Sequence, residues 1–129
     1  MITFTILGEA ASKANSRRLV TIGNRSASIK SSKALKFERS ALLLIPAEAK
    51  QMLDGDIKAT VKLYYSTRRP DLDESIVLDI MQAKFKGSGK NRECVRRGVY
   101  LNDRQIKEKH IYHGIDKHNP RAEIEITVL

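Results

Sequence analysis

A nine-residue alternation of apolar and polar side chains most constrains what this chain can fold into. The apolar members are Ile57, Ala59, Val61, Leu63 and Tyr65, and the polar or amphipathic members are Lys58, Thr60, Lys62 and Tyr64. Successive side chains of a strand point to opposite faces, so the pattern predicts a strand with one face in a core. Pro70 has no amide to donate, and we expect strand pairing to end before Asp71.

Shorter segments repeat this alternation at both ends of the chain. Residues 2–6 and 122–128 have the period of half-buried strands, and residues 107–115 are also expected to be a strand. The apolar runs 19–22 and 27–29 are separated by Gly23-Asn24, which predicts a hairpin.

Two segments have helical spacing. Ser31 or Ser32 can cap a helix whose apolar face holds Ala34, Phe37, Ala41 and Leu44. Asp73 can cap a second helix, with Ile76, Val77, Ile80, Met81 and Phe85 on its apolar face. Residues 86–98, rich in glycine and basic side chains, are expected to form a mobile loop. Together these elements predict one domain, residues 1–129, of the α+β class: a mixed β-sheet with two main helices packed on it.

The charge balance narrows the class of partner. The chain has 24 Lys and Arg against 15 Asp and Glu, a net charge of +9, which favours polyanions. It has no apolar run of about 18 residues and no signal peptide pattern, so we expect a soluble, cytoplasmic protein that does not bind membranes. The one cysteine, Cys94, permits no internal disulfide.

Asp71 and Asp73 stand two residues apart at the end of the long strand. In an extended chain their carboxylates point to the same side and repel each other unless a cation lies between them. Hard divalent metals such as Mg²⁺ suit such oxygen ligands and leave room for a phosphate oxygen and a water. Helix capping is the competing explanation of Asp73, but it does not explain Asp71.

The order of motifs resembles one known family. The strand is followed by Arg69-Pro70-Asp71-Leu72-Asp73, a helix, then Tyr100-Leu101-Asn102-Asp103 and two strands. From about residue 56 to residue 129 this order resembles the RusA family of Holliday junction resolvases, and residues 12–40 resemble it only loosely. The resemblance implies a RusA-like fold and a homodimeric endonuclease that depends on Mg²⁺, with Mn²⁺ as a substitute. It would nick four-way junction DNA symmetrically, in recombination and repair in a bacterial or phage-infected cell.

The resemblance also implies site residues. Asp71, Asp73 and Asp103 match the metal-binding, catalytic acids of the family. Asn102 stands where the family often has a further acid, and the helix lacks the lysine that usually follows the acids. Lys84, Lys62 or a loop arginine takes its place, or activity is reduced. Glu74, Asn102 and Lys84 are therefore auxiliary candidates.

Basic residues in and beside the loops are candidates for binding DNA, although for any one of them alone solvated surface is the favoured explanation. They are Lys13, Arg17, Arg18, Arg25, Lys30, Arg68, Arg69, Lys90, Arg96 and Arg97. His110 and His113 should face opposite sides of their strand and are poor metal ligands. Two alternatives stay open: a non-catalytic nucleic-acid-binding protein, and a nuclease for other branched DNA or for RNA.

Overall fold

The computed structural model describes residues 1–11, 17–68, 70 and 72–129. The two helices are α1 (Ser32–Leu44) and α2 (Ser75–Met81), and short 3-10 turns cover Ala47–Ala49, Gly89–Asn91 and Asp103–Gln105. The strands are β1 (Ile2–Leu7), β2 (Arg17–Ile22), β3 (Arg25–Lys30), β4 (Ile57–Tyr65), β5 (Lys84–Lys86), β6 (Glu93–Arg96), β7 (Ile106–Ile115) and β8 (Arg121–Val128). The expected α+β class is confirmed.

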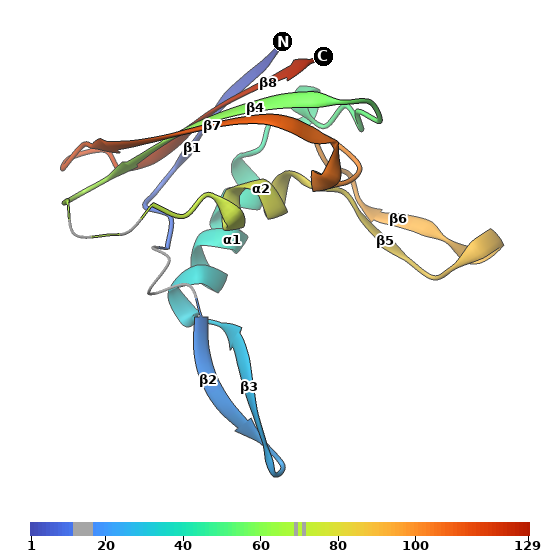
Figure 1. Cartoon of the computed structure of the whole chain (residues 1–129), viewed down its shortest axis with the longest axis horizontal. Coiled ribbons are helices and arrows are strands. Elements are labelled where there is room, and N and C mark those ends of the chain that lie inside the picture. The colour runs from blue at the N-terminus through green and yellow to red at the C-terminus, as the bar shows by residue number, and fades with distance from the viewer. Residues whose placement is uncertain (12–16, 69, 71) are drawn as a thin grey trace.

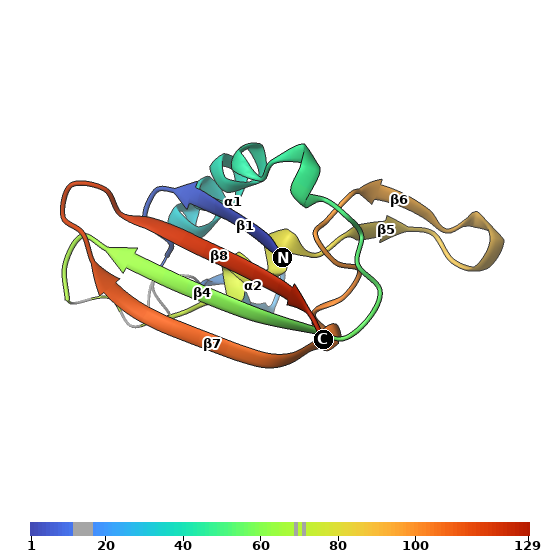
Figure 2. The same ribbon diagram turned by 90° about the horizontal axis from the view of Figure 1, so that it is seen from above.

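Four strands form the main sheet in the order β1-β8-β4-β7 (Figure 2). Strand β8 is antiparallel to both β1 and β4, whereas β7 is parallel to β4. The sheet is therefore mixed, as the sequence predicted. Because β4 and β7 run in the same direction, the segment after β4 and the segment before β7 lie at opposite ends of this strand pair.

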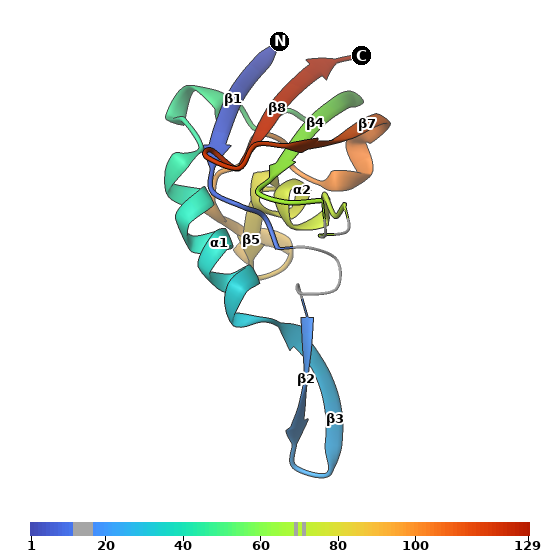
Figure 3. The ribbon, with the colours of Figure 1, turned by 90° about the vertical axis from the view of Figure 1, so that its left-hand side faces the viewer.

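Both helices pack on the same face of the sheet (Figures 1 and 3). The apolar side of β4 is buried under them, with Ile57, Ala59, Val61 and Tyr65 fully enclosed. The alternation that predicted this strand is thus confirmed. No helix or strand of the described chain lies over the opposite face (Figures 1 and 3). The polar members of the alternation point to this face, because they alternate with the buried side chains.

Helix α1 begins where the sequence predicted. The Ser31 side chain accepts a hydrogen bond from the Ala34 amide at 3.1 Å, which is an N-cap. Ala34, Phe37 and Ala41 are buried, but the prediction for Leu44 is wrong because it is partly exposed and Ile45 is buried in its place. The chain leaves the helix at Ile45, so the helical spacing no longer decides which side chain enters the core.

Helix α2 is shorter than predicted. It ends at Met81, so Ile76, Val77, Ile80 and Met81 lie in the core as expected while Phe85 belongs to β5. The helix begins at Ser75, and its N-cap position is Glu74 rather than Asp73. Asp73 still accepts the Ser75 amide, so it stabilises the turn that leads into the helix.

Two hairpins project from the body in different directions (Figures 1 and 3). Strands β2 and β3 form the predicted hairpin, with Gly23 at a positive φ of 61° in its turn. Strands β5 and β6 form a second hairpin where a mobile loop was predicted, and that prediction is wrong. Two of the glycines that suggested a loop, Gly87 and Gly89, lie in its tip and have positive φ.

Within the part of the chain that the structure describes, no helix has the length and apolarity needed to cross a membrane.

Candidate active site

Asp73 lies in the extended segment between β4 and α2. Its Oδ1 accepts hydrogen bonds from the Ser75 amide at 3.0 Å and from the Ser75 hydroxyl at 2.7 Å. Its own amide lies 3.5 Å from the Tyr65 hydroxyl oxygen. These contacts leave Oδ2 without a hydrogen bond from the described residues, so it can bind a metal or a water. Asp71, Arg69 and Lys13 were also predicted as site residues, and they lie outside the described residues.

Further acids gather around the end of β4. Glu9, which follows β1, accepts the Ser66 amide at 2.9 Å and the Ser66 hydroxyl at 3.0 Å. Burial raises the pKa of the Tyr65 hydroxyl, and the negative charges of Asp73, Glu9 and Glu74 raise it further, against the lowering effect of the Asp73 amide. Three carboxylates are thus close enough to act on one phenol, in a corner of the fold at the carboxyl end of β4.

Glu74 has a cationic partner that sequence reasoning missed. Its Oε1 lies 3.1 Å from Nζ of Lys109, a residue of β7. The parallel register of β7 with β4 pairs Lys109 with Ala59, an inward-facing residue, so the lysine side chain is on the helix-covered face. Sequence spacing gives no sign of this proximity, because 35 positions separate the two residues and only the parallel pairing of the strands brings them together.

Asp103 lies at the other end of α2. It opens the 3-10 turn before β7, and its amide donates to Oε1 of Gln82 at 2.9 Å. Gln82 is the C-cap residue of α2. Asp103 is exposed, and its charge contributes to raising the pKa of the buried Tyr100 hydroxyl, for which burial is the main cause.

The two predicted acids that the structure describes are therefore not adjacent within one chain. The seven residues of α2 separate Asp73 from Asp103, and the rise of an α-helix makes that span ~10 Å or more. Two carboxylates on one Mg²⁺ each lie roughly 2 Å from it. Consistently, the described residues contain no group of three His, Cys, Asp or Glu that could hold a metal ion.

The auxiliary candidates divide in the same way. Oδ1 of Asn102 accepts the Arg104 amide at 2.9 Å and caps the 3-10 turn, so it already has a structural role. Lys84 is exposed in β5, beyond the C-terminal end of α2 and away from Asp73. Of the auxiliary candidates, only Glu74 lies beside Asp73.

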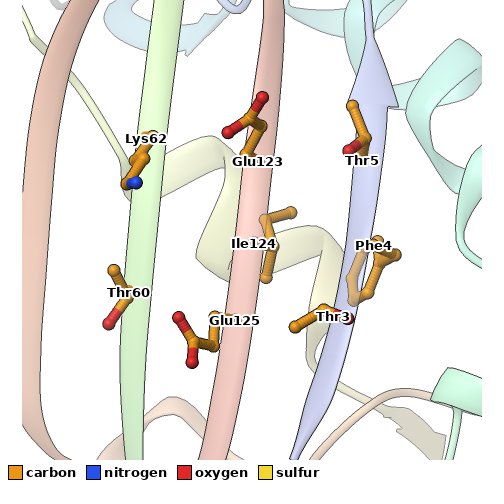
Figure 4. Close-up of a pocket in the computed structure, with 8 residues that line it drawn as sticks. All are labelled: Thr3, Phe4, Thr5, Thr60, Lys62, Glu123, Ile124 and Glu125. Carbon is orange, nitrogen blue, oxygen red and sulfur yellow. The ribbon is translucent and has the colours of Figure 1, made fainter.

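Lys62 lies on the wrong face of the sheet to replace the missing helix lysine. Figure 4 shows it on the outer face, in a hollow shared with Glu123 and Glu125 of β8, with α2 behind the sheet. Arg121 pairs with Glu123 at 2.8 Å, and Lys62 shares the hollow with Glu125. Little net positive charge is therefore left there for phosphate, so the outer face is a poor candidate for the nucleic-acid site.

The two histidines of β7 lie as the sequence predicted. His113 stacks on the buried Tyr65 with ring centroids 5.0 Å apart, whereas Nε2 of His110 lies 3.7 Å from Oε1 of Glu108. They face opposite sides of the strand, and among the described residues neither belongs to a group that could hold a metal ion.

The predicted DNA-binding cations differ in their availability. Lys30 forms ion pairs with Glu38 at 2.8 Å and Asp79 at 3.4 Å, and these raise the pKa of its ammonium group against the lowering effect of burial. Arg96 donates to the Asp79 and Gln82 carbonyls at 3.4 and 3.1 Å. Both residues therefore have structural roles.

Other cations remain exposed. Arg97 donates only a long hydrogen bond, 3.4 Å, to the Lys50 carbonyl. Four other predicted cations are exposed and form no ion pair with the rest of the described chain. They are Arg18, Arg25, Arg68 and Lys90, and Lys90 lies at the tip of the second hairpin. Arg17 begins β2. Among the predicted DNA-binding cations, the exposed ones therefore lie on the two hairpins, at Arg97 and in the segment before Asp73.

Comparison of the sequence with protein-family models and with curated proteins gives no match.

Proposed function

We propose that this protein is a divalent-metal-dependent endonuclease that cuts four-way junction DNA by paired nicking. The observation that carries the proposal is the pair of acids at the N-terminal end of α2, where Asp73 has a carboxylate oxygen without a described partner and Glu74 pairs with Lys109, in a chain of net charge +9. Neighbouring carboxylates repel each other and also repel a phosphate. If such a site binds DNA, a bound cation is expected to neutralise the carboxylates.

The donor chemistry of this corner fits Mg²⁺, with Mn²⁺ as a substitute. Asp73 supplies a hard carboxylate oxygen, Oδ2, that no described residue occupies, and Asp71 stands two positions earlier in the sequence. When bound, such an ion polarises a phosphate and activates water. Within the chain, Ser75 would orient the Asp73 carboxylate, and Lys109 would supply positive charge at the neighbouring Glu74.

The position of Asp103 indicates how the two subunits of the proposed homodimer could share their sites. Within one chain it is separated from Asp73 by the length of α2, but it is exposed and available to a second copy. A two-fold dimer places one site on each of two symmetry-related strands of a junction. We propose that each site takes Asp71 and Asp73 from one subunit and Asp103 from the other. Such a DNA substrate also implies the cytoplasm of a bacterial or phage-infected cell.

The test is cleavage of matched substrates with and without Mg²⁺. A four-way junction, a duplex, a single strand and a branched RNA of related sequence are incubated with the protein, and the products are separated on denaturing gels. The proposal predicts symmetric nicks in the junction alone, and only with Mg²⁺ or Mn²⁺. If the protein cleaves no DNA substrate with either metal, the proposal is contradicted. If it cleaves the branched RNA in preference to DNA, the substrate is RNA and not a DNA junction.

A non-catalytic nucleic-acid-binding protein is the second candidate. The observation in its favour is that Asp73 already has a structural role, since its Oδ1 holds the turn into α2 through Ser75. This candidate predicts junction binding with no metal-dependent cleavage.

A further inference from the structure

The second hairpin, β5–β6, is an exposed basic ribbon. Residues 84–97 hold six Lys or Arg and one acid, Glu93, so this segment carries more than half of the chain's net charge of +9. Every residue from Lys86 to Val95 is exposed, and the ribbon projects from the body alone (Figures 1 and 2). An isolated two-stranded ribbon that buries little is marginally stable, so its persistence needs support at its base or from a partner.

The base of this ribbon is firmly attached to the body. Arg96 donates to carbonyls at the C-terminal end of α2, and Gly98 passes so close to Met81, Gln82 and Ala83 that a Cβ atom there would overlap their backbone. Farther along the ribbon, the Arg92 guanidinium lies 4.2 Å above the centre of the Phe85 ring. The ribbon is therefore held in a defined direction, with charge at its far end.

The shape of the ribbon fits one kind of polyanion. Entry into the minor groove of B-DNA, about 6 Å wide, would require a two-stranded ribbon to widen the groove and bend the duplex. The major groove, about 12 Å wide, admits a two-stranded ribbon. Its walls are phosphates, which complement the Lys and Arg side chains of residues 84–97.

We propose that the β5–β6 hairpin enters the major groove of duplex DNA and holds it by phosphate contacts. The inference deepens the proposed function and rests on its DNA substrate, because it assigns the grip on a duplex arm of the junction to this hairpin. It does not involve the acids at the other end of α2. Phosphate contacts carry no sequence information, so the grip is expected to be similar for arms of different sequence.

The test uses the double variant Lys86→Gln with Lys90→Gln, two exposed residues without ion pairs among the described residues. The matched control is Lys36→Gln with Lys117→Gln, which removes the same charge from exposed positions outside both hairpins. Affinity for a plain duplex and for a junction is measured without divalent metal over a range of salt concentrations. Each lost phosphate contact lowers the slope of log affinity against log salt by ~0.9, and we expect about a tenfold loss of affinity.

Groove occupancy is measured by methylation of guanine N7, which lies in the major groove. We expect the wild type and the control to protect N7 on a duplex arm and the hairpin variant to lose that protection. Unchanged affinity and slope in the hairpin variant, or protection of minor-groove positions instead, would each overturn the inference. Since no cleavage is measured, an inactive protein that binds duplex in this way contradicts the proposed function and leaves this inference standing.

Discussion

The two ends of α2 differ in how completely their polar groups are satisfied. At the N-terminal end, Asp73 and Glu74 lie in an open corner with Lys109, and one Asp73 oxygen accepts no hydrogen bond from the described residues. At the C-terminal end, Arg96 covers backbone carbonyls, Gly98 allows a close crossing, and Gln82 holds the Asp103 backbone. The N-terminal end therefore has a carboxylate oxygen that is free to bind a ligand, whereas the polar groups of the C-terminal end are closely packed and hydrogen-bonded.

We predict that this difference separates residues that affect the proposed cleavage activity from residues that affect stability. Changes at the N-terminal end should alter cleavage and leave the fold intact. Changes at the C-terminal end should weaken the fold, with Asp103 as the exception because its side chain is exposed. The comparison is wrong if changes at the N-terminal end destabilise the fold, or if changes at the C-terminal end other than at Asp103 alter cleavage without affecting stability.

The largest expected effect is on cleavage by Asp73→Asn. Asparagine keeps an oxygen to accept the Ser75 amide, so the turn should persist while the metal-binding charge is lost. We expect the rate of junction cleavage to fall at least about a hundredfold. Loss of a residue that only hydrogen-bonds a metal ligand lowers activity by about ten- to a hundredfold, and loss of the ligand itself should cost more. Junction binding without metal should be retained or strengthened, as measured by gel shift.

Glu48→Gln is the control for this change, since Glu48 is an exposed acid without an ion pair among the described residues and lies in the Ala47–Ala49 turn, apart from the candidate acids. It should leave cleavage unchanged. Full activity of Asp73→Asn would remove the N-terminal corner from the active site.

Gly98→Ala should have the largest effect on stability. The added Cβ would overlap backbone atoms of residues 81–83, which cannot move without shifting the end of α2. Overpacking of this kind costs about 2 kcal/mol. Urea denaturation of Gly98→Ala and Gly55→Ala makes the comparison, because a Cβ on Gly55 meets no atom within 4 Å. Equal stability of the two variants would mean that the C-terminal end is not tightly packed.

Lys109→Gln should have a smaller effect on cleavage. Removing its charge leaves Glu74 unpaired beside the proposed phosphate position, but half-exposed charges are weakened by solvent. We expect roughly a tenfold fall in the cleavage rate, less than for a preorganised buried donor. Lys109→Arg should recover most of it.

Lys107→Gln is the matched control for Lys109, two residues earlier on the same strand and also exposed. Equal losses in Lys107→Gln and Lys109→Gln would indicate general attraction of DNA and not a role at the acids.

The sequence predicted those elements correctly whose structure depends on a single local pattern of side chains. The alternation of β4 and the Ser31 cap were correct because side-chain direction and a local hydrogen bond determine them. The end of α2 and the β5–β6 hairpin were predicted wrongly. Phe85 continued the helical spacing, and the glycines of the tip suggested a loop throughout, whereas pairing of β5 with β6 determined the outcome.

The candidate site was predictable only in part, for a related reason. Asp73 was found because it is close in sequence to the end of β4. Lys109 was missed because only the parallel pairing of β7 with β4 brings it to Glu74. The structural roles of Lys30 and Arg96 depend on partners in other elements, which composition cannot reveal.

The measurement that tests the account most directly is cleavage by a mixed dimer. Asp73→Asn and Asp103→Asn chains with different affinity tags are co-expressed, and the species that carries both tags is purified. If each site takes acids from both subunits, one site of the mixed dimer holds both changes and the other holds neither. We predict that each variant alone is inactive and that the mixed dimer nicks one strand of a junction without paired cutting. A mixed dimer as inactive as its parents would contradict the account.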